Sequence, residues 1–398
     1  MQKPDPDADR GRNASPASDA EPDLARAPVP DLHDRIARLR AAGPVAAVRF
    51  HGRPAWLTTT WAETRAALAD EDHFPSASIQ EPLVGKTMQS MIGDAHRRNR
   101  ALIASAFTPR GVETQQKTLL EPLAHELIDA LAGESRFDLV ARFAHRFPAL
   151  VITRLLGIPV HDEKLFLDWG LALFLFPWNP EKATAAWRAF RDYLTPIVRA
   201  RRAAPGSDLL SRLLAAELEG ERLTEDEIFS FLGILYPAGA DTAFKAIASM
   251  MAAVLGERSL FERARGDAPL CTAIADETLR FEAPVALLPR RAARAMELGG
   301  QAIAAGDQML LGITAANRDP AVFADPDRFD PGRRGLEKSL VFGHGPHFCL
   351  GAQLARAELR VALGALAERL PSMRLEDPAD VETVGAILRG PKRVIVRV

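Results

Sequence analysis

Residues Phe342 to Gly351 read FGHGPHFCLG, and this stretch decides the fold class. A glycine-rich turn, which includes Gly343, carries Cys349 to the start of an amphipathic segment that predicts a helix from Ala352 to about Glu368. The N-terminus of a helix offers free N–H groups and a positive partial charge, and both favour a thiolate over a thiol. The pattern indicates an activated cysteine held against a bound group.

Three interpretations of Cys349 are open at this point. A thiolate is a strong donor to haem iron, and glycines let a backbone lie close to a flat cofactor. A buried cysteine in a glycine-rich loop is the structural alternative. A zinc site formed by His344, His347 and Cys349 is the third, but it lacks a fourth ligand and the paired-cysteine spacing of many zinc proteins.

The stretch resembles the haem-binding loop of cytochromes P450, of the form F-G-x-G-x-H-x-C-x-G, at every defined position. The continuation LARxE at residues 354–358 also matches. The resemblance implies a mainly α fold with small β-sheets, in which haem b lies between two long helices. It also implies that Cys349 is the axial ligand of the iron and that Phe342, Gly343 and Gly351 form the loop against the cofactor.

Two further sets of residues match the family. Glu277 and Arg280 are three residues apart on a predicted helix, where a solvated surface pair is the ordinary interpretation. They resemble the E-x-x-R pair of the family, for which Arg328 would supply a third buried charge. The resemblance implies that the haem propionates are bound by cationic or hydrogen-bonding side chains, here His96, Arg100, Arg290 and His347.

The motif Ala238-Gly239-Ala240-Asp241-Thr242 lies within a long predicted helix, residues 225–255. By the resemblance, Gly239 leaves room for oxygen and substrate, Thr242 donates a hydrogen bond to the oxygen, and Asp241 relays protons. The alternative is a weak point in a helix whose Asp and Thr face water. Pro237 directly precedes the motif and removes a backbone hydrogen bond, which predicts a kink.

Composition excludes several other classes of protein. The chain has 398 residues with 50 Lys and Arg against 52 Asp and Glu, so no basic excess points to nucleic acid. Its 2 cysteines are fewer than a large extracellular protein usually carries. The first residues lack the apolar core of a signal peptide, and no apolar run is long enough to span a membrane. We therefore expect a soluble, cytoplasmic protein.

The pattern along the chain predicts a disordered tail over residues 1–30 and a single domain over 31–398. The tail is rich in Pro, Asp and Ala, with too little apolar surface to offset its ordering entropy. A β-hairpin is expected over residues 46–59, mostly helices as far as residue 260, and short strands from residue 285 onward.

The resemblance implies a monooxygenase that inserts one oxygen atom from O2 into a substrate, with electrons from a ferredoxin or flavodoxin-type donor and its reductase. We expect this donor to be a separate protein, docked near Arg97, Arg98 and Arg360. We expect a mostly apolar substrate, covered by the apolar segment 171–178 and flanked by Val285, Leu287 and Leu288. The alternatives are haem-thiolate coupling, desaturation or peroxide-driven oxidation, and a non-catalytic haem sensor.

Overall fold

The computed structural model describes residues 23–24, 28–76, 81–104, 107, 109–159, 163–174, 176, 179–218 and 220–398. The α-helices are α1 (Leu32–Ala42), α2 (Trp61–Ala69), α3 (Glu81–Val84), α4 (Gly93–Ala104), α5 (Pro109–Gln115), α6 (Glu121–Asp129), α7 (Arg146–Leu155), α8 (Glu163–Phe174), α9 (Pro180–Ala203), α10 (Leu209–Ala215), α11 (Glu225–Gly256), α12 (Arg258–Ala264), α13 (Ala268–Phe281), α14 (Ile313–Asn317) and α15 (Ala352–Arg369). Two π-helical segments, Gln116–Leu120 and Val140–Ala144, precede α6 and α7.

The strands are short and lie mostly at the two ends of the described chain. They are β1 (Val45–Phe50), β2 (Arg53–Thr58), β3 (Arg136–Asp138), β4 (Glu217–Leu218), β5 (Glu221–Arg222), β6 (Leu288–Arg291), β7 (Met296–Leu298), β8 (Gln301–Ile303), β9 (Gln308–Leu311), β10 (Arg374–Leu375), β11 (Thr383–Val384), β12 (Gly390–Pro391) and β13 (Ile395–Arg397). The largest sheet has the order β1-β2-β9-β6, and its β2–β9 pair is parallel. The expected mainly α fold with small β-sheets is therefore confirmed.

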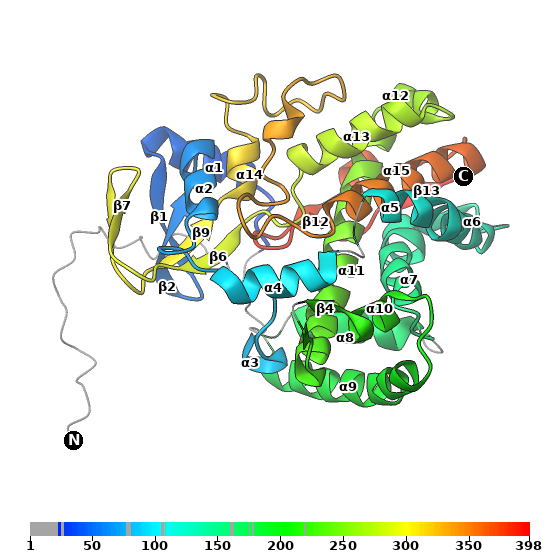
Figure 1. The fold of residues 1–398 in the computed structure, drawn as a ribbon. Helices are drawn as coiled ribbons and strands as arrows, with labels where there is room; N and C mark the ends of the chain where they lie inside the picture. The colour runs from blue at the N-terminus through cyan, green and yellow to red at the C-terminus, as the bar shows by residue number, and fades with distance from the viewer. Residues whose placement is uncertain are drawn as a thin grey trace.

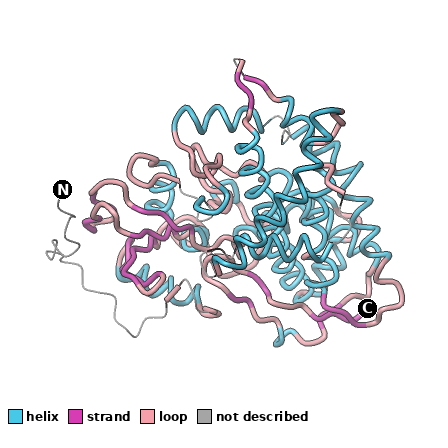
Figure 2. The backbone as a smooth tube through the Cα atoms, turned by 90° about the horizontal axis from the view of Figure 1, so that it is seen from below, coloured by secondary structure: helices cyan, strands magenta, loops and turns pink. Residues whose placement is uncertain are grey.

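Helix α11 is the axis of the helical body, and the β1-β2-β9-β6 sheet lies to one side of that body (Figure 1). In the view from below, the main group of strands lies on one side, and shorter strands lie at the edges of the helical body, one group of them beside the C-terminus (Figure 2). A capping box begins α11: the side chains of Thr224 and Glu227 each accept a hydrogen bond from the backbone N–H of the other residue. The helix then continues through Pro237 to Gly256. Helices α7, α8 and α15 pack against it, so α11 and α15 are the two long helices next to the cysteine loop.

The described part of the N-terminal region differs from the expected tail. Leu24 and Val29 are buried, with 7% and 2% of their surface exposed, in a small core formed with α1 and the β1–β2 hairpin. Asp23 accepts hydrogen bonds from the backbone N–H groups of the hairpin turn. The packed chain therefore begins before residue 31; residues 1–22 and 25–27 of the expected tail lie outside the described residues.

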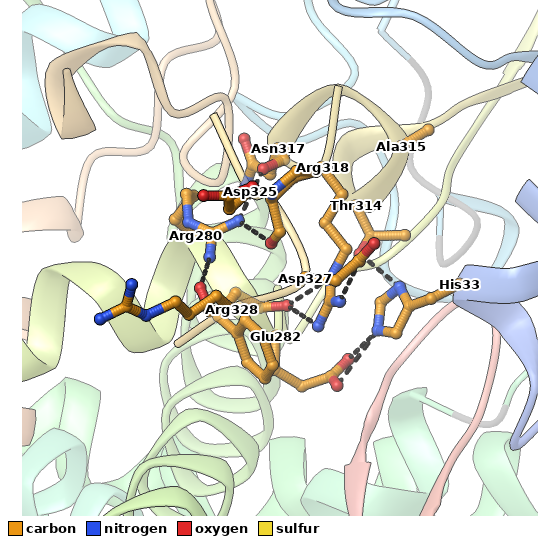
Figure 3. Close-up of polar contacts among 12 residues, drawn as sticks. His33, Arg280, Glu282, Thr314, Ala315, Asn317, Arg318, Asp325, Asp327 and Arg328 are labelled. Atoms are coloured by element: carbon orange, nitrogen blue, oxygen red, sulfur yellow. Dashed lines mark hydrogen bonds and ion pairs between the residues drawn. The ribbon is translucent and has the colours of Figure 1, made fainter. Parts of the chain in front are cut away.

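Glu277 and Arg280 on α13 form a buried ion pair, and neither side chain has exposed surface. Arg280 makes two bonds of 2.7 and 2.8 Å to the Glu277 carboxylate. The third charged partner is Arg333, whose Nε lies 3.1 Å from Glu277 Oε1, so the prediction of Arg328 was wrong. Arg328 contributes its backbone carbonyl to Arg280 and Arg333, while its side chain points away from this cluster (Figure 3).

Candidate active site

A cavity of about 380 Å³ lies between α11 and the cysteine loop. Its wall is formed by residues from α4, α11, the segment before β6, and the loop that precedes α15. Apolar atoms make up most of this wall. Cys349 lies on one side of the cavity and Thr242 lines it from α11, so the two predicted halves of the site share one space.

The cysteine loop is held in shape by two glycines with left-handed backbone angles. Gly343 and Gly345 have φ values of 76° and 77°, which a side chain would strain. The backbone N–H of Cys349 donates to the carbonyl of Phe342 at 2.8 Å and closes the loop. Gly351 then precedes the first turn of α15. All four expected loop residues, Phe342, Gly343, Cys349 and Gly351, line the cavity.

The electrostatics of the Cys349 thiol differ from the expectation of a depressed pKa. Desolvation by the surrounding wall raises the pKa of Cys349 above its ordinary value, and it outweighs the opposing effects of the Gly351 N–H and of Arg100 and Arg356. The protein alone therefore favours the neutral thiol, although Cys349 is exposed to the cavity and α15 begins directly after Gly351. A cation bound in the cavity would favour the thiolate.

Four side chains from three elements meet at one corner of the cavity. His96 and Arg100 come from α4, Arg290 from β6 and His347 from the cysteine loop. The His96 and His347 rings lie 4.1 Å apart, and His96 Nε2 is buried without a hydrogen-bond partner. Burial lowers the pKa of Arg290 to about 10, although the guanidinium still donates to the Pro289 carbonyl. Such a corner favours anions, since two guanidinium groups are present.

One residue of this corner was missed by the sequence analysis. Glu71 follows α2, and its Oε1 lies 2.8 Å from His347 Nε2. Atoms of Glu71, His96 and His347 lie within 4.8 Å of one another, in place of the His344–His347–Cys349 set considered for zinc. Burial lowers the pKa of His347 to about 4, and the positive charges of His96, Arg290 and Arg100 contribute to this shift. The same field disfavours a metal cation here.

The helix motif on α11 divides between two faces. Thr242 lines the cavity and its hydroxyl donates to the Ala238 carbonyl at 2.7 Å, so its lone pairs, rather than its proton, are open to a ligand. A Cβ at Gly239 would lie 2.6 Å from Ile152 Cδ1. A larger residue at this position would force the Ile152 side chain of α7 to move, and it would also narrow the cavity that Gly239 lines.

Asp241 lies behind the cavity wall rather than in it. Its side chain is buried, and Oδ2 has no hydrogen-bond partner. Desolvation raises the pKa of Asp241 to about 7, and the charge of Lys245 opposes this shift. Lys245 was not singled out from the sequence, although its spacing of four residues from Asp241 was a usable signal. A carboxyl that titrates near neutral pH suits proton transfer.

Some of the residues expected around the substrate line the cavity, and others do not. Val285, Leu287 and Leu288 line the cavity, together with Ile234 and Leu235 of α11. The expected cover is different: Leu173 is fully buried in the core and Leu171 is exposed, and neither lines the cavity. Leu175, Trp178 and the side chain of Phe174, which belong to the same expectation, lie outside the described residues.

Comparisons with known proteins agree with this geometry. Residues 151–398 match the family model "Cytochrome P450". The chain is 36% identical to the cytochrome P450 monooxygenase PikC of Streptomyces venezuelae, over 92% of this chain and 91% of the relative. The solved structure of the cytochrome P450 PksS of Bacillus subtilis 168 superposes with a TM-score of 0.86 at 31% identity, over 92% of this chain and 97% of that one. A myxobacterial P450, CYP267B1 in complex with myristic acid, gives 0.84 at 33% identity, over 92% and 96%.

Proteins of this family use haem b, and the cavity fits that group. A thiol that lines the cavity can ligate the iron, and the anion-favouring corner can receive the two propionates. The unpartnered nitrogen of His96 and the partly desolvated Arg290 are polar groups for which a carboxylate is the missing partner. When bound, the haem supplies the chemistry of dioxygen activation.

Proposed function

This chain belongs to the cytochrome P450 family, and from that premise we propose that it oxygenates a mostly apolar organic small molecule with electrons from a separate redox protein. The family and its named monooxygenases make it an oxygen-incorporating oxidoreductase. The observation that carries the proposal is the apolar wall above Cys349, to which α11 and the segment before β6 contribute. The myristic acid bound by CYP267B1 is an apolar ligand of a relative with the same fold.

The residues of the chain have distinct roles in this proposal. Cys349 ligates the iron, and the loop residues Phe342, Gly343 and Gly351 shape the surface beneath the cofactor. His96, Arg100, Arg290 and His347 bind the propionates.

On the other side of the cavity, Thr242 accepts a hydrogen bond from water or from a protonated oxygen atom of the reacting substrate. Asp241 holds a proton near neutral pH and exchanges it toward Thr242, while Gly239 leaves room for the Ile152 side chain of α7.

The redox partner is proposed to be a ferredoxin or flavodoxin-type protein with its reductase, which approaches the cysteine side. Of the three arginines expected to form a basic docking patch, two have partners on other elements of the protein. Arg98 is paired with Glu221 and Glu227, and Arg360 donates to Gln116. Arg97 stays exposed, with 78% of its side-chain surface accessible, and pairs with Asp94. Docking therefore depends on Arg97 more than on Arg98, and it should weaken with salt.

The proposal includes a single domain in the cytoplasm, and this domain extends beyond the expected range of 31–398 to include the packed residues Leu24 and Val29. One described helix, α11, is long and apolar enough to cross a membrane, but 61% of its most apolar window is buried within the protein. Its burial identifies it as a core helix. The proposed tail is limited to residues 1–22 and 25–27, which lie outside the described residues.

Two experiments test the proposal. The reduced carbon monoxide adduct should show the absorption of thiolate ligation, and Cys349→His should move the band to the imidazole position. With apolar compounds that shift the Soret band, turnover under isotopically labelled O2 should place one labelled atom in the product. If products form but none carries the label, ring coupling or desaturation would be favoured instead. If Cys349→His left the spectrum unchanged, Cys349 would not be the iron ligand.

A further inference from the structure

The turn after α2 brings a carboxylate to the propionate corner. Gly345 of the cysteine loop lies against the end of α2, where a Cβ on the glycine would be 3.2 Å from Ala69 Cα. In the same turn, the Asp70 carboxylate accepts a hydrogen bond from the backbone N–H of His73 and also binds the Nδ1 atom of the His73 ring. The turn is therefore fixed on the loop and directs Glu71 at His347.

The Glu71–His347 contact is close but incomplete. The two atoms, Oε1 and Nε2, are 2.8 Å apart, yet they lie off the line of a hydrogen bond, and both are buried without another partner. On its other side the His347 ring packs on His96, whose own Nε2 is buried and unpartnered. Unsatisfied buried polar atoms are rare in folded proteins, so three of them at one corner indicate that a ligand group completes the arrangement.

We propose that Glu71 is a positioning residue for the haem propionates, because it fixes the His347 ring between its own carboxylate and the face of His96. Arg100 and Arg290 supply positive charge to the two propionates, and His96, whose buried Nε2 has no partner in the protein, supplies a hydrogen bond whose direction depends on how the His347 ring packs against it. A carboxylate commonly orients an imidazole at metal sites, and the same kind of contact would orient His347 at this corner. The inference rests on the family's cofactor and not on the substrate or the redox partner proposed above.

Asp72 provides a matched control for Glu71. It is the next residue and carries the same charge, but it is exposed. An effect of general charge or of the turn itself would appear in both positions, whereas an effect through His347 belongs to Glu71 alone. Glu71→Gln separates the contact from the charge, since a glutamine amide can still accept a hydrogen bond from the imidazole.

The test measures the rate at which each purified holoprotein loses haem to an excess of apomyoglobin. Glu71→Ala should lose haem about 5- to 20-fold faster than the unsubstituted protein, because it removes the contact that fixes the His347 ring and leaves a buried ring nitrogen with no polar neighbour. Glu71→Gln and Asp72→Ala should stay within about twofold of it. Resonance Raman spectra should show a shifted propionate bending mode in Glu71→Ala, restored in Glu71→Gln.

Two results would overturn the inference. If Glu71→Ala kept both its haem-loss rate and its propionate mode, Glu71 would have no role at the corner. If Glu71→Gln lost haem as fast as Glu71→Ala, the amide would not rescue the contact and orientation of His347 would not be the cause. Neither readout depends on turnover, so a wrong substrate or redox partner leaves this test intact.

Discussion

Two buried acids on neighbouring helices have opposite surroundings. Glu277 on α13 has no exposed surface and accepts bonds from Arg280, from Arg333 and from the backbone N–H of Asp330. Asp241 on α11 is almost as deeply buried, but one of its oxygens has no partner and Lys245 is its nearby counter-charge. The first carboxylate has three hydrogen-bonding partners, two of them guanidinium groups, whereas burial raises the pKa of the second to about 7.

The contrast separates a structural charge from a reactive one. A buried charge with several charge-assisted bonds is costly to disturb, which suits a structural link between α13 and the irregular segment that contains Arg333. A buried carboxyl with few bonds changes protonation easily near neutral pH, at a cost in stability. The protein tolerates the second kind on α11, where the proposed reaction requires protons.

The largest expected effect comes from removing the partner of the paired acid. Arg280→Met should lower the free energy of unfolding by about 3–5 kcal/mol, because Glu277 would remain as a buried and partly uncompensated charge. Urea denaturation and the haem content per chain measure it. Arg97→Met is the matched control: Arg97 and Asp94 have the same spacing of three residues but are exposed, so its effect should be within about 0.5 kcal/mol. Similar losses in both variants would contradict the distinction.

The stability that Asp241 contributes should depend on pH. Because the pKa of Asp241 is raised on folding from 3.8 to about 7, its proton is bound more tightly in the folded state. The stability this confers is complete below about pH 4 and is lost as the pH rises through 7. Asp241→Asn should therefore be more stable than the unsubstituted protein by about 1–4 kcal/mol at pH 8, and equal to it at pH 4.

Thermal or urea unfolding across this pH range checks the Asp241 prediction. The exposed Asp72→Asn should give a difference that does not change between pH 4 and pH 8. A stability difference for Asp241→Asn that stayed flat with pH would mean that Asp241 is ionised in the folded protein throughout.

A smaller effect distinguishes the two arginines of the Glu277 cluster. Arg333→Met should cost about 1–3 kcal/mol, since it removes a nearly buried donor to Glu277 and to three backbone carbonyls. Arg328→Met should cost less than about 0.5 kcal/mol, because only the backbone of Arg328 takes part. Equal unfolding midpoints for the two variants would restore Arg328 as a partner.

The sequence predicted the parts of the molecule that depend on local pattern. The Cys349 loop, α11 and α15 follow from glycine positions, capping residues and helical periodicity, which act within a few residues. The choice of Arg328 over Arg333 failed because both lie in an irregular segment, where no periodicity fixes which side chain turns inward. The boundary of the N-terminal tail failed for a related reason, since Leu24 and Val29 are buried by contacts with a hairpin that local composition does not reveal.

Contacts between distant segments account for the rest. Glu71 and His347 are 276 residues apart, and no pattern in either segment indicates that they meet. The apolar residues of α8 gave the opposite error: Leu173 faces the core and Leu171 the solvent, so an apolar run alone did not tell a pocket cover from a packed helix. Cys349 shows the limit for electrostatics, because its helix N-terminus was visible in the sequence and its desolvation was not.

The last prediction concerns Thr242, where stability should hardly change and coupling should. Thr242→Ala keeps the helix former and removes a hydroxyl that already donates to its own helix, so unfolding should shift by less than about 0.5 kcal/mol. What is lost is an acceptor in the cavity, at the position that follows Asp241 on α11. Without this acceptor, protons are no longer directed to one atom of the dioxygen that is being reduced. Hydrogen peroxide should then be released in place of oxygenated product.

Product formed per electron should fall about 2- to 10-fold in Thr242→Ala, the ratio carried by a hydrogen bond of about 0.5–1.5 kcal/mol, while reductant consumption continues. Thr242→Ser keeps the hydroxyl and should restore most of the coupling. Asp241→Asn should instead slow oxygen consumption itself, because it removes the proton before Thr242 can direct it. Measuring product, peroxide and reductant together separates the two. Full coupling in Thr242→Ala would mean that another acceptor, such as a hydroxyl of the substrate, directs the proton.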